Sequence, residues 1–460
     1  MYIDTHSHLH ARDYASDLAE VIARARGAGV ETVALIGEDA ADSLRAAELA
    51  NKDDIFIIAA GLHPHRAAAW SDDEAGVIRD LVKRAPRAAA IGEIGLDYHY
   101  DHATRRQQRA AFTAQLALAR ECGMPVVVHC REAYEDAISI LREHAGELRG
   151  VMHCWFGSIE QARAFVDMGF MLGIGGAVTF PKAAELCDVV RAVPLDHIVL
   201  ETDAPYMTPA PHRGERNEPA HIPLIASRIA ELRGLHAGDV ARVTLLNSAR
   251  LFGLDVENRP VIAYPIRDSL YINLTNRCTA LCVFCDRLGG ATVKGHNLRL
   301  RHEPARDEII AAIGASGGAG RWDEVVFCGY GEPALRFDLM LDLARWLKGP
   351  GGARQVRLNT NGHADLINKR PTLPEMSGLI DMVSVSLNAA DEETYNRLVR
   401  PFDRRNSWRA MIQFLRDARG YIPNIQATAV AYPGLDLEPV RALATSFGAS
   451  FRVRHYNEVG

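Results

Sequence analysis

The feature of this sequence that most constrains its fold is the alternation of apolar β-rich runs with amphipathic helical segments over residues 1–255. Eight runs have the composition of buried strands, and the residues that close them are His8, Gly37, His63, Asp97, His129, His153, Gly175 and Asp203. Helix-like stretches such as Asp39–Asn51 and Thr104–Cys122 separate the runs. This α/β pattern predicts a parallel (β/α)8 barrel of the TIM class, with an open doubly wound sheet as the alternative.

Histidines and carboxylates stand at the ends of five of the predicted strands. The set comprises His6, His8, Glu93, His129, His153 and Asp203, with Glu93 expected near the end of the fourth strand, whose run extends to Asp97. In a barrel the carboxyl ends of the strands converge on one face, so these side chains would share one pocket. Any one of the histidines could be a core residue satisfied by its neighbours. Together the six favour two divalent ions, because buried ionisable groups need partners or metals, and imidazole and carboxylate suit Zn, Mn, Fe or Mg.

Seven motifs in order make the first half similar to a known family. They are Ile3–Leu9, Gly61–Pro64, Ile91–Tyr98, Val128–Ala133, His153–Gly157, Leu200–Pro205 and Arg213–Pro219. Residues 1–255 resemble the TatD-type metal-dependent nucleases. The resemblance implies a two-metal phosphodiesterase that cuts DNA or RNA from an end, and His10 stands where that family is expected to carry an aspartate.

Roles for individual residues follow from this expected site. Glu93 would bridge the two ions (Mg, Mn or Zn), and Asp203 would ligate one ion and accept the proton of the attacking water. Glu201 would hydrogen-bond a ligand histidine. His63 and Arg131 would hold the phosphate, although Arg131 could equally form a structural ion pair.

Two other interpretations of the first half stay open. The barrel could hydrolyse an amide or a cyclic ring, as amidohydrolases do, although their modified bridging lysine has no counterpart in Ala88–Asp97. The barrel could also be a non-catalytic partner domain, but the complete ligand set argues against that.

A short segment rich in proline follows. Asp255–Pro265 carries two prolines and no helical period, so we expect a linker at residues 256–265 between domains 1–255 and 266–460. In the second domain, strand-like runs end at Leu274, Cys328, Asn359, Leu387, Ala431 and His455. Six strands, most of them followed by a helix, predict an open, partial (β/α)6 barrel.

Three cysteines follow the first of these strands. Cys278, Cys282 and Cys285 are too closely spaced for paired zinc knuckles, and a zinc site would need a fourth ligand such as Cys328 or His302. Three thiolates also suit a [4Fe–4S] cluster with one open iron, which the spacing favours over zinc.

The surrounding motifs make the second half similar to the radical S-adenosylmethionine superfamily, over about residues 268–460. They are the cysteine motif with Phe284 before its last cysteine, Phe327–Pro333, Asn359–Gly362 and Val383–Asn388. The resemblance implies a [4Fe–4S] cluster that binds S-adenosylmethionine and, with one electron from a donor, cleaves it to a 5′-deoxyadenosyl radical that attacks an unidentified substrate.

The same resemblance implies cofactor contacts for several residues. Gly331 and Glu332 would hold the methionine amino group, although Tyr330 replaces the family's usual first glycine. Asn359, Ser386 and Asn388 would face the ribose or carboxylate, or else only make strand-end hydrogen bonds. Gly329 and Gly331 could also be ordinary turn glycines.

Composition limits the remaining possibilities. With 460 residues, 48% hydrophobic, and no apolar run of membrane-helix length or signal sequence, we expect a cytoplasmic enzyme without membrane contact. Residues 266–460 carry 25 Lys+Arg against 21 Asp+Glu, which leaves 27 against 37 for residues 1–265. An acidic first half argues against non-specific wrapping of nucleic acid but permits a phosphodiester substrate held by metals.

Overall fold

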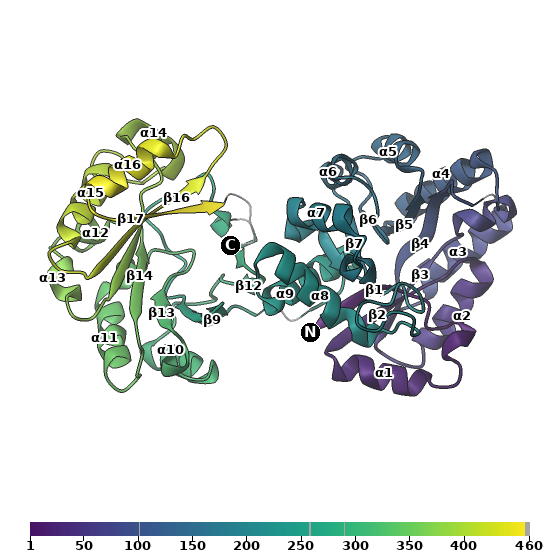
Figure 1. The fold of residues 1–460 in the computed structure, drawn as a ribbon, viewed down its shortest axis with the longest axis horizontal. Coiled ribbons are helices and arrows are strands. Elements are labelled where there is room, and N and C mark those ends of the chain that lie inside the picture. The colour runs from purple at the N-terminus through teal and green to yellow at the C-terminus, as the bar shows by residue number, and fades with distance from the viewer. Residues whose placement is uncertain (101, 257–258, 289, 456–460) are drawn as a thin grey trace. The chain divides into compact units, whose positions relative to one another are not determined.

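The computed structural model describes residues 1–100, 102–256, 259–288 and 290–455. The chain divides into two compact units, Met1–Val256 (unit 1) and Glu257–Gly460 (unit 2) (Figure 1). Two residues of the expected linker, Glu257 and Asn258, lie outside the described residues, and the expected domain boundaries stay a prediction. Within the described ranges, no helix combines the length and apolar character needed to cross a membrane.

Unit 1 contains an eight-stranded sheet whose strands follow one another in chain order, each parallel to the next. The strands are β1 (Tyr2–Ser7), β2 (Val30–Ile36), β3 (Phe56–Ala60), β4 (Ala88–Asp97), β5 (Val126–Arg131), β6 (Gly150–Met152), β7 (Met171–Ile174) and β8 (Ile198–Leu200). The chain after β8 returns to β1, where Asp203 N donates to His6 O over 2.9 Å and His8 N donates to Ala204 O over 2.8 Å. These bonds join the two ends of the sheet, so the predicted barrel is confirmed and the open sheet is wrong.

Helices surround this barrel (Figure 1). They are α1 (Leu18–Gly27), α2 (Ala40–Ala50), α3 (Asp72–Arg84), α4 (Arg105–Cys122), α5 (Tyr134–Arg142), α6 (Ile159–Asp167), α7 (Ala184–Ala192), α8 (Ile222–Arg233) and α9 (Ala237–Phe252). Local sequence sets their ends. Thr104 and Gln107 form a reciprocal capping box at the start of α4, and Gly123 ends that helix with φ of 67°.

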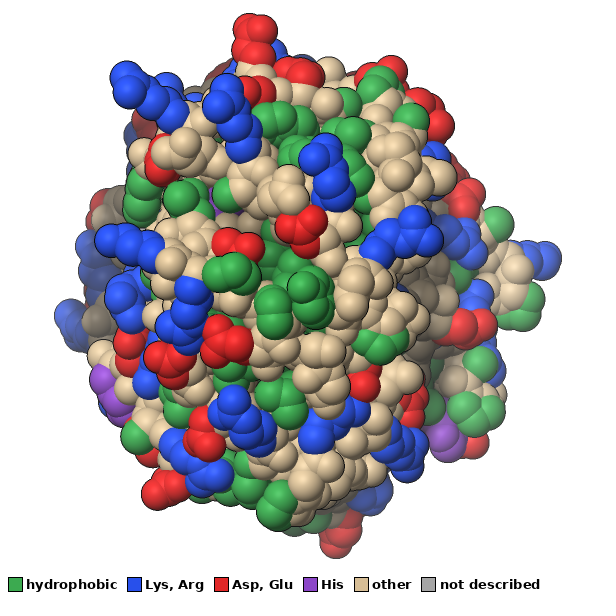
Figure 2. Space-filling model, turned by 90° about the vertical axis from the view of Figure 1, so that its left-hand side faces the viewer, with side chains coloured by type: hydrophobic (Ala, Val, Ile, Leu, Met, Phe, Trp, Pro, Cys, Tyr) green, Lys and Arg blue, Asp and Glu red, His purple; other side chains and the backbone are tan. Residues whose placement is uncertain are grey.

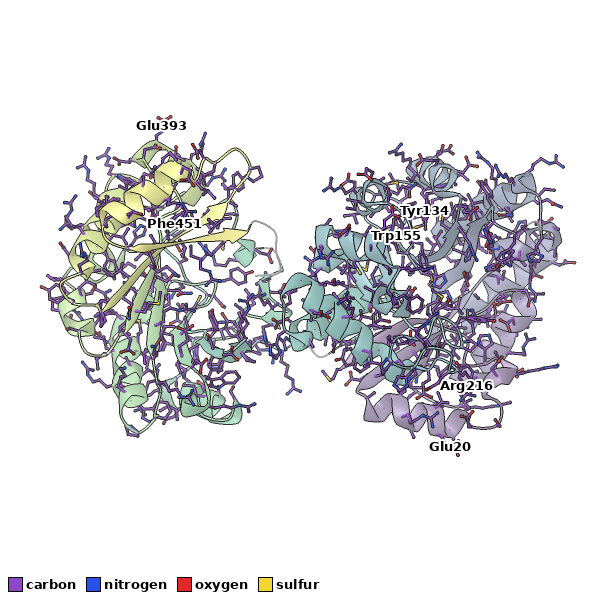
Figure 3. All side chains as sticks on the ribbon, in the orientation of Figure 1. Glu20, Tyr134, Trp155, Arg216, Glu393 and Phe451 are labelled. Atoms are coloured by element: carbon purple, nitrogen blue, oxygen red, sulfur yellow. The ribbon has the colours of Figure 1, made fainter. Side chains whose placement is uncertain are left out.

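An aromatic cluster holds the loop after β6. The ring of Trp155 lies 5.1 Å from that of Tyr134 and 5.6 Å from that of Phe165, and the first pair is labelled in Figure 3. The Trp155 indole N–H donates to Gly157 O over 3.0 Å, so the buried ring has its polar partner. The packing of Trp155 against Tyr134 and Phe165 therefore holds the loop that carries His153.

The sequence predicted Glu93 near the end of its strand, but the structure does not place it there. β4 continues to Asp97, and Glu93 lies in its middle. The pairing of β4 with β5 shifts register between Ile91 and Ile94, which is the interval that contains Glu93. Such an irregularity re-aims side chains, which lets a residue inside the strand face the site.

Unit 2 contains a seven-stranded sheet in the order β17-β16-β15-β14-β13-β10-β9. Its strands are β9 (Ala263–Ile266), β10 (Ser269–Ile272), β13 (Glu324–Phe327), β14 (Val356–Thr360), β15 (Met382–Ser386), β16 (Asn424–Ala431) and β17 (Ser450–His455), and a small hairpin pairs β11 (Thr292–Val293) with β12 (His296–Asn297). All pairs from β10 to β17 are parallel, which confirms the predicted partial (β/α)6 barrel. Residues 263–265, expected in the linker, instead belong to β9, which pairs antiparallel with β10.

Helices cover one face of this sheet (Figure 1). They are α10 (Arg306–Ala315), α11 (Phe337–Lys348), α12 (Ala364–Asn368), α13 (Leu373–Met376), α14 (Glu392–Val399), α15 (Ser407–Ala418) and α16 (Glu438–Ser446). Their apolar residues pack on strand residues such as Leu270, Phe327, Leu358, Val385 and Ala429 in one core. Because neighbouring residues of a strand point to opposite faces, the residues between these lie on the other, concave face.

Candidate functional site

The structure brings the six predicted ligand residues of unit 1 together at one end of the barrel. Three of the groupings whose ligand atoms lie within 4.8 Å of one another use only sequence-predicted residues: His6 with His8 and Asp203, His6 with Glu93 and His153, and His63 with Glu93 and His129. Since Glu93 and His6 each belong to two groupings, the donor set is continuous. Imidazoles and carboxylates at this spacing fit one or two divalent ions.

Glu93 lies at the centre of this arrangement. Its Oε1 is 2.8 Å from His129 Nδ1 and its Oε2 is 3.4 Å from His6 Nε2, although only 3% of the residue is exposed. Burial by itself would raise the pKa of Glu93, but the surrounding His63, His153 and His6 hold it well below its usual range. The carboxylate is therefore anionic and has both oxygens turned towards imidazoles, as a bridging ligand requires.

Asp203 occupies a different electrostatic environment. Its Oδ1 lies 3.7 Å from both His6 Nε2 and His8 Nε2, and its backbone φ of 58° is left-handed. Burial raises the pKa of Asp203 to about 7, with Glu93 and Glu201 adding to the effect of burial. A carboxyl group with such a pKa can exchange a proton near neutral pH.

Outer contacts orient the histidines. His153 Nδ1 lies 3.2 Å from Glu201 Oε1, and the same oxygen accepts a hydrogen bond from Cys154 N over 2.6 Å. Burial lowers the pKa of His153, but Glu201 and Glu93 raise it to about 10. His8 Nδ1 lies 3.1 Å from Ile36 O, which leaves its Nε2 for the site. The sequence assigned this orienting position to Glu201.

The two predicted phosphate contacts lie on either side of β4, with His63 in the loop after β3 and Arg131 at the end of β5. His63 Nε2 is 3.6 Å from Glu93 Oε1, while its Nδ1 accepts from His65 N over 3.2 Å. Arg131 ends β5 and lies with its guanidinium 5.0 Å from the centre of the Tyr100 ring. Among the described residues, no carboxylate forms an ion pair with Arg131, so the structural ion pair considered for it is not seen there.

Two residues near the site, Asp97 and Cys154, were missed by sequence reasoning. Asp97 Oδ2 lies 2.9 Å from His129 Nε2 and 3.0 Å from His65 Nε2, and burial leaves 1% of Asp97 exposed. The sequence signal for Asp97 was its position four residues after Glu93 in the same predicted strand, because an even spacing in a strand places two residues on the same face. Cys154, interpreted as a small buried hydrophobe, places its sulfur within 4.8 Å of ligand atoms of His153 and Asp203.

In unit 2, the three clustered cysteines lie on the loop after β10. Backbone bonds from Leu281 N to Arg400 O and from Val283 N to Leu398 O hold this loop. Cys278, Cys282 and Cys285 are free, partly buried thiols. Burial, followed by nearby Glu332, raises the pKa of Cys278 to about 11.

The three clustered thiols do not form a compact group at zinc-ligand spacing. A zinc ion holds each sulfur at about 2.3 Å, which brings the sulfurs within about 4 Å of one another. The described residues contain no such group of three thiols within 4.8 Å. His302, the other zinc ligand considered, is exposed, and its Nε2 lies 2.9 Å from Glu308 Oε1. Three thiolates are also the protein ligand set of a [4Fe–4S] cluster with one open iron.

Glu332 and its neighbouring glycines form a rigid turn beside the cysteine loop. Glu332 Oε1 accepts from the Thr360 hydroxyl over 2.8 Å, and Oε2 accepts from Asn361 N over 2.8 Å. Burial raises the pKa of Glu332 to about 7 despite these bonds. A Cβ on Gly331 would lie 2.0 Å from Thr275 O, so only glycine fits there. Both oxygens of the Glu332 carboxylate therefore already accept hydrogen bonds from the chain.

The other residues predicted to contact the cofactor differ in how many hydrogen bonds they already form within the chain. Asn359 Oδ1 is buried without a hydrogen-bond partner among the described residues, so it is able to accept a ligand donor. Ser386 Oγ and Asn388 Oδ1 each accept from Arg454 at 3.4 Å, and Asn388 Oδ1 also accepts from Val430 N over 3.2 Å. The Phe284 ring lies 6.3 Å from that of Tyr432, near the cysteines in sequence. A Cβ on Gly329 would lie 2.2 Å from Asn273 Oδ1, which shows a close backbone approach there.

Comparison with known proteins decides the family. Residues 3–253, more than half of the chain, match the family described as TatD related DNase, and residues 272–446 match the Radical SAM superfamily. The chain belongs to the TatD related DNase family. It also carries a radical SAM domain after the TatD barrel, so both halves belong to enzyme families.

The TatD half is similar to whole proteins. It is 40% identical over 256 residues to the uncharacterized metal-dependent hydrolase YabD of Bacillus subtilis, which covers 55% of this chain and 100% of that protein. It is 40% identical over 253 residues to the 3′-5′ ssDNA/RNA exonuclease TatD of Erwinia tasmaniensis, covering 54% of this chain and 97% of that protein. The crystal structure of the TatD homologue YjjV from Escherichia coli is 31% identical and covers 55% of this chain and 98% of that chain, with a TM-score of 0.53.

Proposed function

We propose that this protein is bifunctional, with a divalent-metal-dependent phosphodiester hydrolase in unit 1 and a radical S-adenosylmethionine enzyme in unit 2. The observation that carries the first activity is the convergence of four histidines and two carboxylates from five strands and the loops after them. In this proposal His6, His8, Glu93, His129, His153 and Asp203 hold two ions, chosen from Mg, Mn and Zn.

The bound ions would supply charge stabilisation and an activated water. The chain's own residues then have separate tasks. Glu93, held anionic between the histidines, would be a ligand shared by the two ions, and Asp203, with its pKa of about 7, would accept the proton of the attacking water. Arg131 and His63 hold the scissile phosphate, for which the two N–H groups of a guanidinium are suited.

For the substrate of unit 1, we propose ends of single-stranded DNA or RNA. The support is the printed activity of the Erwinia tasmaniensis relative, which is 40% identical over nearly its whole length. The acidic balance of residues 1–265 suits local capture of one strand end by metals better than wrapping of a long polyanion.

In unit 2, Cys278, Cys282 and Cys285 would hold a [4Fe–4S] cluster with one open iron. With an electron donor, the cluster supplies reductive cleavage of S-adenosylmethionine to a 5′-deoxyadenosyl radical. Asn359 has an unpartnered buried oxygen for this cofactor, and Phe284, Gly329, Gly331, Glu332, Ser386 and Asn388 line the same end of the partial barrel in this proposal.

Two assays test the two activities separately. Purified protein with Mn²⁺ or Mg²⁺ should shorten labelled single-stranded DNA or RNA, and Glu93→Gln should remove this activity. Absence of cleavage with any divalent ion in a folded sample would overturn the hydrolase proposal. Anaerobically reconstituted protein with reductant should form 5′-deoxyadenosine, and finding zinc instead of iron and sulfide would overturn the radical proposal.

A further inference from the structure

The concave face of unit 2 is polar and carries arginines. On β17, Phe451 (labelled in Figure 3) packs with the helix-side core, and the Arg441 guanidinium of α16 lies 4.9 Å from its ring centre. Arg452, the next residue, therefore points to the opposite, concave face. Arg357 of β14 lies between the core residues Val356 and Leu358 and so shares that face.

Arg357 is the most buried of these cations. Only 8% of it is exposed, and its Nη2 lies 3.0 Å from Glu324 and 3.0 Å from the Tyr271 hydroxyl. Its Nε is buried and has no hydrogen-bond partner among the described residues. A buried guanidinium N–H without an acceptor is costly, so an acceptor from outside the protein is expected.

Arg452 brings a second charge to the same concave face. It is exposed, and among the described residues no carboxylate forms an ion pair with it. Arg452 and Arg357 both act electrostatically on Tyr271, and each opposes the rise in the pKa of Tyr271 that burial causes. Arg357 thus donates to the phenol hydroxyl and pairs with Glu324, and Arg452 adds a second positive charge on the same face of the sheet.

Neither the cluster nor the outer surface explains these two arginines. Arg454 contacts Ser386 and Asn388, whereas among the described residues no hydrogen bond or ion pair joins Arg357 or Arg452 to the cysteine loop. On the helical face of unit 2 shown in Figure 2, basic and acidic side chains are interspersed. The concave face instead gathers cations with a buried, unpartnered N–H.

We propose that Arg357, Arg452 and Tyr271 bind an oxyanion of the radical substrate, a phosphate or a carboxylate, on the concave face of unit 2. This inference rests on the radical function proposed above. A guanidinium N–H pair and a phenol O–H are donors that match such oxygens, and the partly buried site strengthens their attraction. The substrate class is therefore an anionic metabolite or nucleotide whose charged end is anchored here while another part faces the cofactor.

Binding of small anions to the full-length, cluster-reconstituted protein tests the proposal. Isothermal titration calorimetry with inorganic phosphate and with acetate would be compared for the wild type, Arg357→Gln, Arg452→Gln and the control Arg441→Gln. Arg441 lies on the helix side of β17, where it pairs with Glu438. Unit 1 has the same sequence in all four proteins, so differences in anion binding between them report on unit 2.

We expect Arg357→Gln and Arg452→Gln to weaken anion binding by about tenfold or more, and Arg441→Gln to leave it unchanged. Preference for phosphate indicates a phosphorylated substrate, and preference for acetate indicates a carboxylate. Equal binding by all four proteins overturns the proposal, as does weaker S-adenosylmethionine binding in Arg452→Gln with anion binding intact.

Two features keep this test decisive. If Arg357→Gln does not fold, because Glu324 loses its partner, the variant of the exposed Arg452 decides the outcome alone. Formation of 5′-deoxyadenosine without substrate is measured in parallel. Its failure would refute the radical function, whereas unchanged anion binding in the variants refutes only the oxyanion site.

Discussion

Asp97 Oδ2 lies 2.9 Å from His129 Nε2, so the imidazole turns its other nitrogen, Nδ1, towards Glu93 at 2.8 Å. The carboxylate fixes both the ring orientation and the tautomer of a proposed metal ligand. Asp97 also accepts from the backbone N–H groups of His99 and Tyr100, each at 3.0 Å, which hold its own position. The pair links the loop after β4 to the metal centre.

Asp97→Asn should lower the affinity for the divalent ion or the hydrolysis rate by about 10- to 100-fold, because the amide cannot hold His129 in the same tautomer. The measurement is metal titration followed by kcat on single-stranded DNA. Asp42→Asn is a matched control, since Asp42 Oδ2 also lies 2.9 Å from a histidine, His10, outside the ligand set. Equal losses in both variants would contradict the positioning role of Asp97.

Asp203→Asn should reduce the hydrolysis rate by about 100-fold or more at saturating metal, because the amide cannot accept the proton of the water. The protein should stay folded, since removal of a buried carboxyl with a raised pKa relieves a desolvation cost. Single-turnover cleavage assays with circular dichroism on the same samples check both points. Activity near that of the wild type would exclude Asp203 as the proton acceptor.

Cys282→Ala should abolish iron incorporation and 5′-deoxyadenosine formation while leaving hydrolysis intact, because the thiol and the barrel site belong to different units. Iron and sulfide analysis, the visible absorption spectrum and both activity assays provide the readouts. Cys122→Ala, which changes a free cysteine at the end of α4, serves as the control. Loss of hydrolysis in Cys282→Ala would show that the two units depend on each other.

His363 should make unit 2 less stable in mild acid. Its ring is fully buried between the hydroxyls of Thr279 and Tyr395, at 3.0 and 2.8 Å, and burial lowers its pKa to about 4. The unfolded chain binds this proton at about pH 6.5, so the stabilising contribution is complete above that pH and is lost as the pH falls towards 4.

The expected contribution of His363 to the free energy of unfolding is about 2 kcal/mol lower at pH 5 than at pH 7. Urea unfolding of the wild type and of His363→Gln at both pH values isolates this contribution, because the other titrating groups are shared. An identical pH dependence in the two proteins would show that His363 is not the responsible group.

Much of the architecture followed from local sequence. Period-two and period-3.6 apolar patterns report burial directly, and they located the eight strands of unit 1 and the six parallel strands of unit 2 within a few residues. The polar residues that interrupt those patterns, such as His129 and Asp203, marked the site because barrel topology gathers strand ends. The sequence therefore predicted which residue types form the site, but not the distances between them.

Tertiary structure alone decided the partners of those residues. The direction in which Glu93 points depends on a register shift between β4 and β5. Residues 263–265 form part of β9 because they pair with the edge of β10. The contacts of Asp97 with His129 and of Arg357 with Tyr271 join strands that are separate in sequence. Sequence periodicity tells which side of a strand a residue occupies, whereas register and curvature of the sheet determine which side chains meet across it.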